Sequence, residues 1–442
     1  MVQAAYNFPR GFLWGTATSA YQVEGNNKNN TWWDWEQENG RILNKDKSGS
    51  ACDWWGGRWK EDLDRADESH HNAHRLSIEW SRVQPSPDRW DEIALDRYRE
   101  IIRSIVERKM VPIVTLHHFS NPIWIEEFGG WENQDMPDLF TKYTLKVVDA
   151  FKEYVNMWVT INEPNVLAAN GYLLGLFPPG KSDISAGLRV MTNMVKAHAG
   201  AYHAIHNLQS NARVGTAVQF RGFLPARNWF AGDMVATKIL NSLFNDFFPV
   251  AFSRGILNFP IWKKRISNAS NTLDFLGINY YTREYVSFNL LNLKELFTKR
   301  TFSPEDELSD SGSIANVPNF LFKAIKWGLK FKRPIIITEN GVENRNDDLR
   351  RKYIIQHIHQ VWRAVNFNFP VKGYLYWTLV DNFEWERGWT QRFGLWELDP
   401  DTQTRRKRPS ADLFAEICQG NCLTSELVTK YSPELLAHLF PG

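Results

Sequence analysis

Short apolar runs alternate with longer amphipathic stretches along the whole chain. Several of the short runs are almost continuously apolar, which is typical of strands buried on both faces of a parallel sheet. Eight runs have the length of a strand: 12–15, 73–78, 111–116, 158–161, 214–218, 275–278, 335–338 and 373–377. The stretches with apolar residues at helical spacing include 96–109, 139–154, 187–208 and 349–367. The pattern predicts eight strand–helix units in succession.

Eight such units favour an α/β fold, a single (β/α)8 TIM barrel with its active site at the C-terminal ends of the strands. The length of 442 residues agrees with this fold, because one barrel with insertions can exceed ~400 residues. No low-complexity or Gly/Ser-rich segment divides the chain, so we expect one catalytic domain over 1–442, with 423–442 as a C-terminal extension. An open, doubly wound sheet is the alternative, but no Gly-x-Gly-x-x-Gly motif follows any run.

Polar and aromatic residues stand at the ends of at least six of the eight apolar runs. In a barrel, these positions lie at the rim where catalytic side chains are found. They include Arg75 and Glu79, His117 and His118, Asn162 and Glu163, Asn279 and Tyr281, Glu339 and Asn340, and Trp377. The pattern therefore predicts that these side chains face one cavity.

Glu163 and Glu339 are the most informative of these residues. Glycoside hydrolysis needs two carboxyl groups beside the scissile bond, one to protonate the leaving oxygen and one to attack or to activate water. A single glutamate at a strand end is at least as often part of a salt bridge at the rim. Two of them, beside His, Asn, Tyr and Trp, indicate a glycosidase.

Three motifs resemble those of a known family. Thr-Ile-Asn-Glu-Pro at 160–164 resembles the acid/base motif of the family 1 glycoside hydrolases, the β-glucosidases and their relatives. Ile-Thr-Glu-Asn-Gly at 337–341 resembles their nucleophile motif, and the stretch 12–25 resembles their N-terminal signature. The resemblance extends over nearly the whole chain and implies a β-glucosidase on a TIM barrel.

The resemblance implies a retaining double displacement. Glu339 would attack the anomeric carbon, and Glu163 would protonate the leaving group and later deprotonate water, with the two carboxyl groups ~5–5.5 Å apart. Glu163 would then need a raised pKa, to which the negative charge of Glu339 would contribute.

The resemblance also assigns roles around the two glutamates. Asn162 would bond the sugar 2-hydroxyl, and Asn279 belongs to the same catalytic group. Tyr281 would donate a hydrogen bond to Glu339, and Arg75 would lie near it, so that a donor and a cation keep the nucleophile ionised.

A first sugar subsite follows from the same resemblance, and a small carbohydrate is the expected partner. Indole faces suit the C–H faces of a pyranose, although a large aromatic core would equally explain the 20 Trp, 14 Tyr and 28 Phe. The hydroxyl ligands would be Gln22, His118, Asn162 and Glu384; Trp377 would form the stacking floor, Trp385 would bond a hydroxyl, and Phe393 would close the far side.

Glu384 favours unphosphorylated β-glucosides, with galactosides and fucosides as secondary substrates, because a 6-phosphate would meet a like charge. Many relatives place a Trp within 310–318 as a wall of the leaving-group subsite. Here Ser313 takes its place, so this subsite is expected to be more open or differently walled. The segment 289–309 is hard to align with the family and is expected to be a mobile loop.

Charge and cysteine content limit the partners and the compartment. The net charge of +2 provides no strong basic field for nucleic acid, and the basic run 405–408 is expected to be a solvated loop. No apolar run reaches ~18 residues, so no membrane span is expected. Three cysteines form no disulfide framework and no signal peptide is visible, so a cytoplasmic location is expected.

Several alternatives remain beside this interpretation. His70 and His74 could share a helix face and bind a metal, but no third ligand is evident, so no metal is expected. The chemistry requires no cofactor and no cofactor motif is visible, so no cofactor is expected. A sugar-binding protein without activity would be expected to lack one catalytic glutamate, and both are present. A transglycosidase would use the same residues as a hydrolase. The oligomeric state is undetermined.

Overall fold

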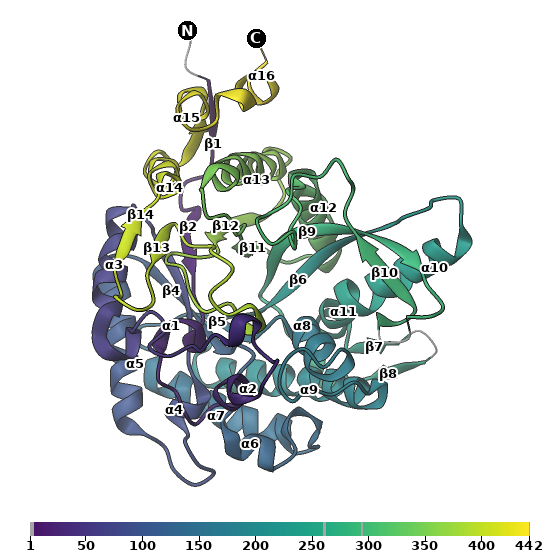
Figure 1. The fold of residues 1–442 in the computed structure, drawn as a ribbon. Coiled ribbons are helices and arrows are strands. Elements are labelled where there is room, and N and C mark those ends of the chain that lie inside the picture. Colours follow the sequence, from purple (N-terminus) through teal and green to yellow (C-terminus); the bar gives the residue numbers. More distant parts are fainter. Residues whose placement is uncertain (1–3, 260–261, 293–294, 442) are drawn as a thin grey trace.

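Eight parallel strands close into a barrel in the computed structural model, which describes residues 4–259, 262–292 and 295–441 (Figure 1). Each barrel strand pairs with the next one along the chain, and β12 pairs with β2 to complete the ring. The strands are β2 (Leu13–Ala17), β3 (Ala73–Ser77), β4 (Val111–His117), β5 (Met157–Asn162), β6 (Arg213–Pro225), β9 (Phe275–Phe288), β11 (Ile335–Asn340) and β12 (Val371–Tyr376). All eight predicted runs overlap these strands, which confirms the TIM barrel.

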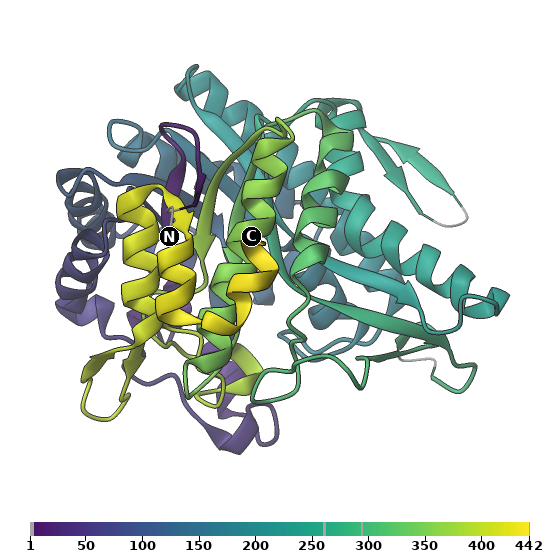
Figure 2. The same cartoon turned by 90° about the horizontal axis from the view of Figure 1, so that it is seen from above.

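Helices surround the ring (Figures 1 and 2). The four helical stretches predicted from the sequence correspond to α5 (Glu92–Glu107), α7 (Met136–Phe151), α9 (Ile184–Leu208) and α13 (Asp348–Asn366). The main covering helices are α3 (Trp59–Glu68), α5 (Glu92–Glu107), α7 (Met136–Phe151), α9 (Ile184–Leu208), α11 (Phe247–Arg254), α12 (Pro318–Gly328), α13 (Asp348–Asn366) and α14 (Pro409–Gly420). Shorter elements in the connections are α1 (Ala20–Glu24), α2 (Thr31–Gln37), α4 (Trp80–Val83), α6 (Ile123–Glu127), α8 (Pro164–Leu167), α10 (Ala231–Leu240), β7 (Ile256–Asn258), β8 (Lys263–Arg265) and β13 (Trp396–Leu398).

The side chains inside the ring form a core of their own. Successive residues of a strand point to opposite faces. Ala73, Val159 and Ile336 therefore pack together in the lumen, whereas Trp158 belongs to the larger core between strands and helices. The strands approach closely at Gly15, where a Cβ would lie 1.8 Å from the carbonyl oxygen of Ala73. A packed lumen gives the predicted site residues a rigid floor.

A ribbon of strands extends beyond the ring. β6 and β9 continue to pair past the barrel, and β10 (Thr298–Thr301) pairs antiparallel with the end of β9. Helix α10 packs against this ribbon. β10 lies within 289–309, so the expectation of a loop is wrong for that part; residues 293 and 294 lie outside the described ranges.

The C-terminal extension docks on the barrel. β15 (Cys422–Thr424) pairs antiparallel with β1 (Ala5–Asn7), and α15 (Ser425–Tyr431) packs against α13. The ring of Tyr6 stacks on that of Phe440, with centroids 4.4 Å apart. Figure 2 shows the C-terminal helices beside α13 and the two chain ends on the same side of the molecule.

The basic run 405–408 is not a solvated loop. Its first three residues form β14 (Arg405–Lys407), and two of its arginines are buried counterions. Arg405 lies 3.1 Å from Asp62, and Arg408 lies 2.8 Å from Asp381. In the described parts of the chain, no helix combines the length and apolar character needed to cross a bilayer.

Candidate active site

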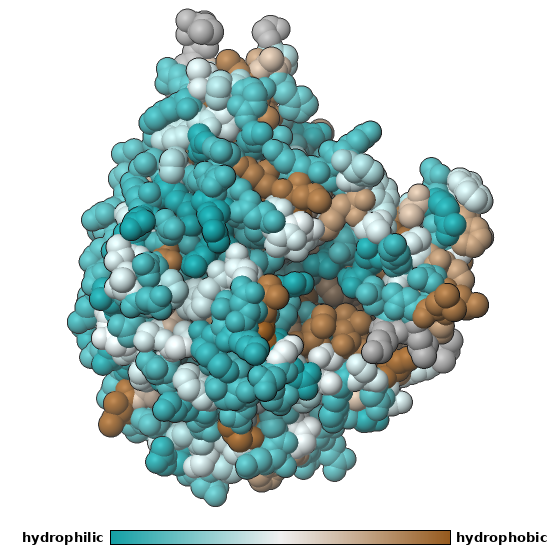
Figure 3. Space-filling view, in the orientation of Figure 1, coloured by the Kyte–Doolittle hydropathy of each residue, from teal (hydrophilic) through white to brown (hydrophobic). Residues whose placement is uncertain are grey.

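A cavity of about 350 Å³ opens where the barrel strands end (Figure 3). Eight of the predicted site residues line it: His118, Glu163, Tyr281, Glu339, Trp377, Glu384, Trp385 and Phe393. The other four, Gln22, Arg75, Asn162 and Asn279, are buried. The last three of these are hydrogen-bonded to lining residues. The structure thus brings the predicted catalytic group together.

Each of the two predicted catalytic motifs coincides with an irregularity in its strand. The register of β5 against β6 shifts between Val159 and Asn162, and that of β11 against β9 shifts between Ile337 and Glu339. An extra residue in one strand reverses the alternation of side chains and changes their direction. Glu163 follows with a left-handed backbone, φ 42°, which a non-glycine residue adopts only where its surroundings hold it. These features aim the two glutamates into the cavity.

Arg75 lies buried on β3 and connects three strands beneath the cavity. Its Nη1 donates to Glu339 Oε1 at 2.6 Å, and its Nη2 donates to Asn162 Oδ1 at 2.7 Å. Its Nε donates to Thr115 Oγ1 at 3.0 Å. The other carboxylate oxygen of Glu339 accepts from the Tyr281 hydroxyl at 2.7 Å. Both oxygens of Glu339 therefore have a donor, which favours the ionised form.

Glu163 has a weaker partner. Asn279 Nδ2 donates to Glu163 Oε1 at 2.9 Å, and Asn279 Oδ1 accepts from Thr338 Oγ1 at 2.6 Å. The threonine fixes the orientation of the amide, so that its NH2 group faces the carboxyl group. Glu163 forms no ion pair within the described residues. A neutral amide stabilises a carboxylate less than a guanidinium does.

The two glutamates differ accordingly in their acid–base behaviour. Burial, together with the negative charge of Glu339, raises the pKa of Glu163 to about 8. Burial also raises the pKa of Glu339, but Arg75 and the Tyr281 hydroxyl act in the opposite direction. The pair therefore holds its proton on Glu163 near neutral pH, while Glu339 carries the negative charge.

Of the residues predicted to bind sugar hydroxyls, His118 lines the cavity and Gln22 does not. His118 Nε2 accepts from Asn162 Nδ2 at 3.0 Å, and burial lowers the pKa of His118 well below its ordinary value. Its Nδ1 is buried and has no partner among the described residues. Gln22 is buried. Its amide donates to the carbonyl oxygen of Phe383 at 2.9 Å and accepts from Ser19 at 2.6 Å.

Trp377 is fixed by its neighbours on two sides. Its indole Nε1 donates to Glu384 Oε1 at 3.1 Å. Behind it, a Cβ on Gly341 would lie 2.0 Å from the Trp377 carbonyl oxygen. The loops after β11 and β12 can touch there only because position 341 has no side chain.

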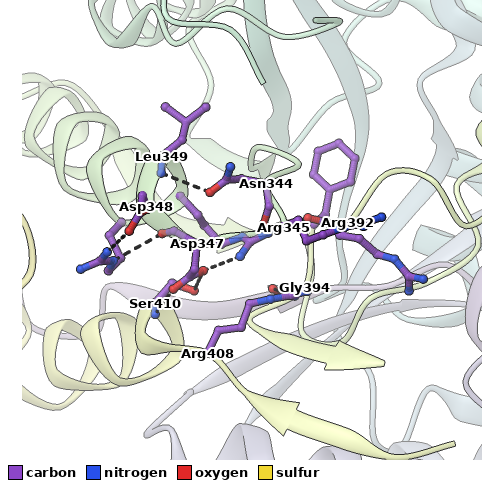
Figure 4. Close-up of polar contacts among 12 residues, drawn as sticks. Asn344, Arg345, Asp347, Asp348, Leu349, Arg392, Gly394, Arg408 and Ser410 are labelled. Atoms are coloured by element: carbon purple, nitrogen blue, oxygen red, sulfur yellow. Dashed lines mark hydrogen bonds and ion pairs between the residues drawn. The ribbon is translucent and has the colours of Figure 1, made fainter. Parts of the chain in front are cut away.

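Phe393 is anchored through the backbone on both sides. Arg408 Nη1 donates to the carbonyl oxygen of Gly394 at 2.6 Å (Figure 4). Arg350 Nη2 donates to the carbonyl oxygen of Arg392 at 2.5 Å. Two buried arginines thus hold the residue that closes this side of the cavity.

Sequence reasoning missed two threonines that hydrogen-bond to predicted site residues. Thr115 accepts from Arg75, and Thr338 donates to Asn279. Each carries a hydroxyl at the end of an otherwise apolar strand run. A hydroxyl buried in such a run needs a partner, and this requirement is the signal that could have identified both residues.

The histidine pair does not form a metal site. His74 lies in β3 and His70 lies between α3 and β3, so the two do not share a helix face. Burial lowers the pKa of His74 to about 4. Among the described residues, no group of three His, Cys, Asp or Glu side chains is arranged to hold a metal ion.

A barrel with two buried carboxyl groups at its rim, one paired with a guanidinium and the other with an amide, has the arrangement that glycoside hydrolases of the paired-carboxylate class use. The family model of Glycosyl hydrolase family 1 matches residues 4–422. The chain is 31% identical to beta-glucosidase A of Thermotoga maritima, over 94% of this chain and 98% of that protein. It is 30% identical to a beta-galactosidase of Pyrococcus woesei, over 95% of this chain and 98% of that protein.

A solved structure agrees with these relatives. A beta-glycosidase from Pyrococcus horikoshii superposes with a TM-score of 0.90 and 35% identity, covering 97% of this chain and 98% of that chain. The chain therefore belongs to glycosyl hydrolase family 1, and it is a β-glycosidase.

Proposed function

We propose that this β-glycosidase is a retaining β-glucosidase that hydrolyses unphosphorylated β-D-glucosides, with β-galactosides and β-fucosides as secondary substrates. Glu339 is the proposed nucleophile and Glu163 the proposed acid/base. The observation that carries the proposal is the unequal support of the two carboxyl groups. Glu339 contacts Arg75 and Tyr281, whereas Glu163 contacts the Asn279 amide.

In the first proposed step, a Glu339 oxygen attacks the anomeric carbon. The bond to the leaving oxygen breaks, and Glu163 transfers its proton to that oxygen. The pKa of about 8 at Glu163 keeps this proton available at neutral pH. The hydrogen bonds of Glu339 keep the attacking group ionised.

In the second step, water replaces the leaving group. Esterification of Glu339 has removed its negative charge, which was one cause of the raised pKa of Glu163. The pKa of Glu163 therefore falls, and its carboxylate can accept a proton as water attacks the anomeric carbon. The ester bond breaks, the charge returns to Glu339, and two inversions give net retention.

The groups around the sugar fit a pyranose. Asn162 is held by Arg75 and His118, so its amide is oriented before substrate arrives, as a group that bonds the 2-hydroxyl should be. Trp377 offers an indole face on the cavity wall, and such a face packs well against sugar C–H groups.

The proposed preference for unphosphorylated sugars rests on the arginines of the described cavity wall, which are already paired with carboxylates and so are not free to bind a phosphate. Burial raises the pKa of Glu384 to about 8, so this carboxyl group repels a phosphate less at neutral pH than its type suggests. The arginines of the described cavity wall are already paired: Arg221 and Arg300 with Glu284, and Arg387 with Glu386. Faster hydrolysis of nitrophenyl glucoside 6-phosphate than of the plain glucoside would contradict this preference.

The mechanism is tested by hydrolysis of nitrophenyl β-glucoside, with wild type compared with Glu339→Ala. We expect loss of activity in the variant and its restoration by azide, with the α-glycosyl azide as product, because the added nucleophile enters opposite the leaving group. Glu343→Ala is the matched control, since Glu343 is also buried but does not line the cavity. A β-glycosyl azide, or an active Glu339→Ala without azide, would refute the assignment.

A cytoplasmic location is proposed from the cysteines. Cys52 and Cys418 are buried free thiols, and Cys422 is a half-buried one. Unpaired thiols are typical of reducing compartments. Fractionation of the native host would test this.

A further inference from the structure

The side chain of Asn279 lies between the proposed acid/base and a threonine that has no role in the proposed chemistry. Its Nδ2 is 2.9 Å from Glu163 Oε1, and its Oδ1 is 2.6 Å from Thr338 Oγ1. Asn279 and Thr338 are fully buried, and Glu163 is 4% exposed. Because bulk water does not reach the amide or the hydroxyl, a hydrogen-bond partner lost here is not replaced from solvent.

The orientation of the Asn279 amide follows from its neighbours. Arg75 Nη2 donates to the side chain of Asn162 at 2.7 Å, and a guanidinium cannot accept, so the atom that faces it is Asn162 Oδ1. The Asn279 amide lies 3.2 Å from this oxygen, so it must present its NH2 group there. Its carbonyl oxygen then faces Thr338, and the threonine hydroxyl has to be the donor.

Within the described residues, the Thr338 hydroxyl is the one donor to Asn279 Oδ1. A buried carbonyl oxygen without a donor is strongly unfavourable. Without the hydroxyl, this oxygen can regain a donor by turning toward the protonated carboxyl group of Glu163. Even in its present orientation, an amide whose carbonyl has lost a hydrogen bond donates more weakly through its NH2 group. Both effects favour the protonated form of Glu163.

We propose that Thr338 is a positioning residue for the acid/base: its hydroxyl holds the NH2 group of Asn279 toward Glu163 and so favours transfer of the Glu163 proton to the leaving oxygen. The inference rests on the proposed retaining mechanism and extends it to this threonine. The hydrogen bond from Asn279 opposes the rise in the pKa of Glu163 that burial and Glu339 cause. Strand β11 would therefore provide both the nucleophile and the residue that tunes the acid/base.

The charged and titratable groups around Glu163 are unchanged when the Thr338 hydroxyl is removed. They are Glu339 of β11, Arg75 of β3, Arg221 of β6 and Tyr281 of β9. Threonine carries no charge, and valine has the same branched shape. A movement of the Glu163 titration in Thr338→Val would therefore come from hydrogen bonding and not from a change in nearby charge.

The test follows the alkaline limb of kcat/KM against pH for nitrophenyl β-glucoside, with the full chain. Thr338→Val removes the hydroxyl, whereas Thr338→Ser keeps it. Thr216→Val is the matched control, because Thr216 is also a fully buried strand threonine, and its hydroxyl donates to the carbonyl oxygen of Ile161 at 2.8 Å. Thr338→Ala also lacks the hydroxyl and takes the place of Thr338→Val if that variant does not fold.

We expect the alkaline limb to move upward by about one pH unit in Thr338→Val, which corresponds to the loss of one hydrogen bond to a charged group. Thr338→Ser and Thr216→Val should keep the wild-type limb. In an Asn279→Ala background, adding Thr338→Val should move the limb no further, because the threonine acts through this amide. An unmoved limb in Thr338→Val, an equal movement in Thr216→Val, or a further movement in the Asn279→Ala background would overturn the inference.

Glu163→Gln in the same assay separates this inference from the proposed function. If Glu163→Gln abolishes the alkaline limb but Thr338→Val only lowers the rate at every pH, Thr338 has a structural role and the mechanism still stands. If the limb persists in Glu163→Gln, Glu163 is not the acid/base and both proposals fail.

Discussion

Replacing Tyr281 with phenylalanine removes one hydroxyl and keeps the ring in place. That hydroxyl donates to Glu339 Oε2 at 2.7 Å. A hydrogen bond to a charged group contributes about 1.5–3 kcal/mol, and one pKa unit corresponds to about 1.4 kcal/mol. The loss destabilises the ionised form, so the pKa of Glu339 rises in the variant.

The sign of the effect on activity follows from the role of Glu339. The nucleophile must be ionised, so activity is present above its pKa and is lost as pH falls through it. The acidic limb of the kcat/KM profile for nitrophenyl β-glucoside should therefore move to higher pH by about one to two units. The alkaline limb, which reports loss of the Glu163 proton, should stay near pH 8, because the pKa of Glu163 is about 8.

Tyr280→Phe provides the matched control. The Tyr280 hydroxyl donates to the carbonyl oxygen of Val317, also at 2.7 Å, but this acceptor is neutral and Tyr280 does not line the cavity. Its acidic limb should not move. An unmoved limb in Tyr281→Phe, or an equal movement in Tyr280→Phe, would show that the Tyr281 hydroxyl does not support the nucleophile.

Three further outcomes are expected. Glu163→Gln should abolish the alkaline limb and slow the hydrolysis of alkyl glucosides more than that of nitrophenyl glucosides, because the poorer leaving group depends more on protonation; initial rates across pH check this. Asp347→Asn should lower the melting temperature, because Asp347 pairs with the buried Arg350 and accepts a hydrogen bond from Ser410 (Figure 4). Breaking a buried ion pair of this kind costs about 3–5 kcal/mol. Asp348→Asn, at an exposed position, is the control in the thermal unfolding experiment. Dialysis against EDTA should leave kcat unchanged, and a loss restored by a divalent cation would reveal a metal requirement.

The strand positions were predictable because a barrel buries both faces of each strand. The prediction was least complete for β6 and β9, where runs at 214–218 and 275–278 correspond to Arg213–Pro225 and Phe275–Phe288. Beyond the ring these strands are only partly buried, so the continuous apolar signal ends before the strand does. The prediction of a solvated loop at 405–408 was wrong for a different reason. Its charges are buried against Asp62 and Asp381, which lie far away in sequence.

The set of residues that gather at the candidate site could be predicted from the sequence, but their geometry could not. Motifs identified Glu163 and Glu339, but the strand irregularities that aim them depend on pairing with neighbouring strands, which an isolated run does not reveal. Part of the cavity lining could not be predicted for a similar reason. Leu173, Met191 and Leu240 each read as ordinary core residues, and only the fold brings them to one surface.

Because of Arg75, the two proposed catalytic glutamates should contribute unequally to the stability of the fold. It is fully buried, and its guanidinium is paired with Glu339. Glu339→Ala leaves this cation without its counterion, which costs about 3–5 kcal/mol in comparable buried pairs. Glu163→Ala removes a group that holds its proton near neutral pH, since its pKa is about 8, and leaves no charge unpaired.

Thermal unfolding should therefore show a much lower melting temperature for Glu339→Ala than for Glu163→Ala. Azide should raise the melting temperature of Glu339→Ala, because the anion can occupy the vacated place beside Arg75, and a ligand that binds only the folded state stabilises it. Chloride at equal ionic strength is the control for screening, and wild type should not respond to azide. Equal melting temperatures for the two variants would mean that Arg75 tolerates the loss of Glu339. The charge of this arginine would then not explain why Glu339, rather than Glu163, is the ionised member of the pair.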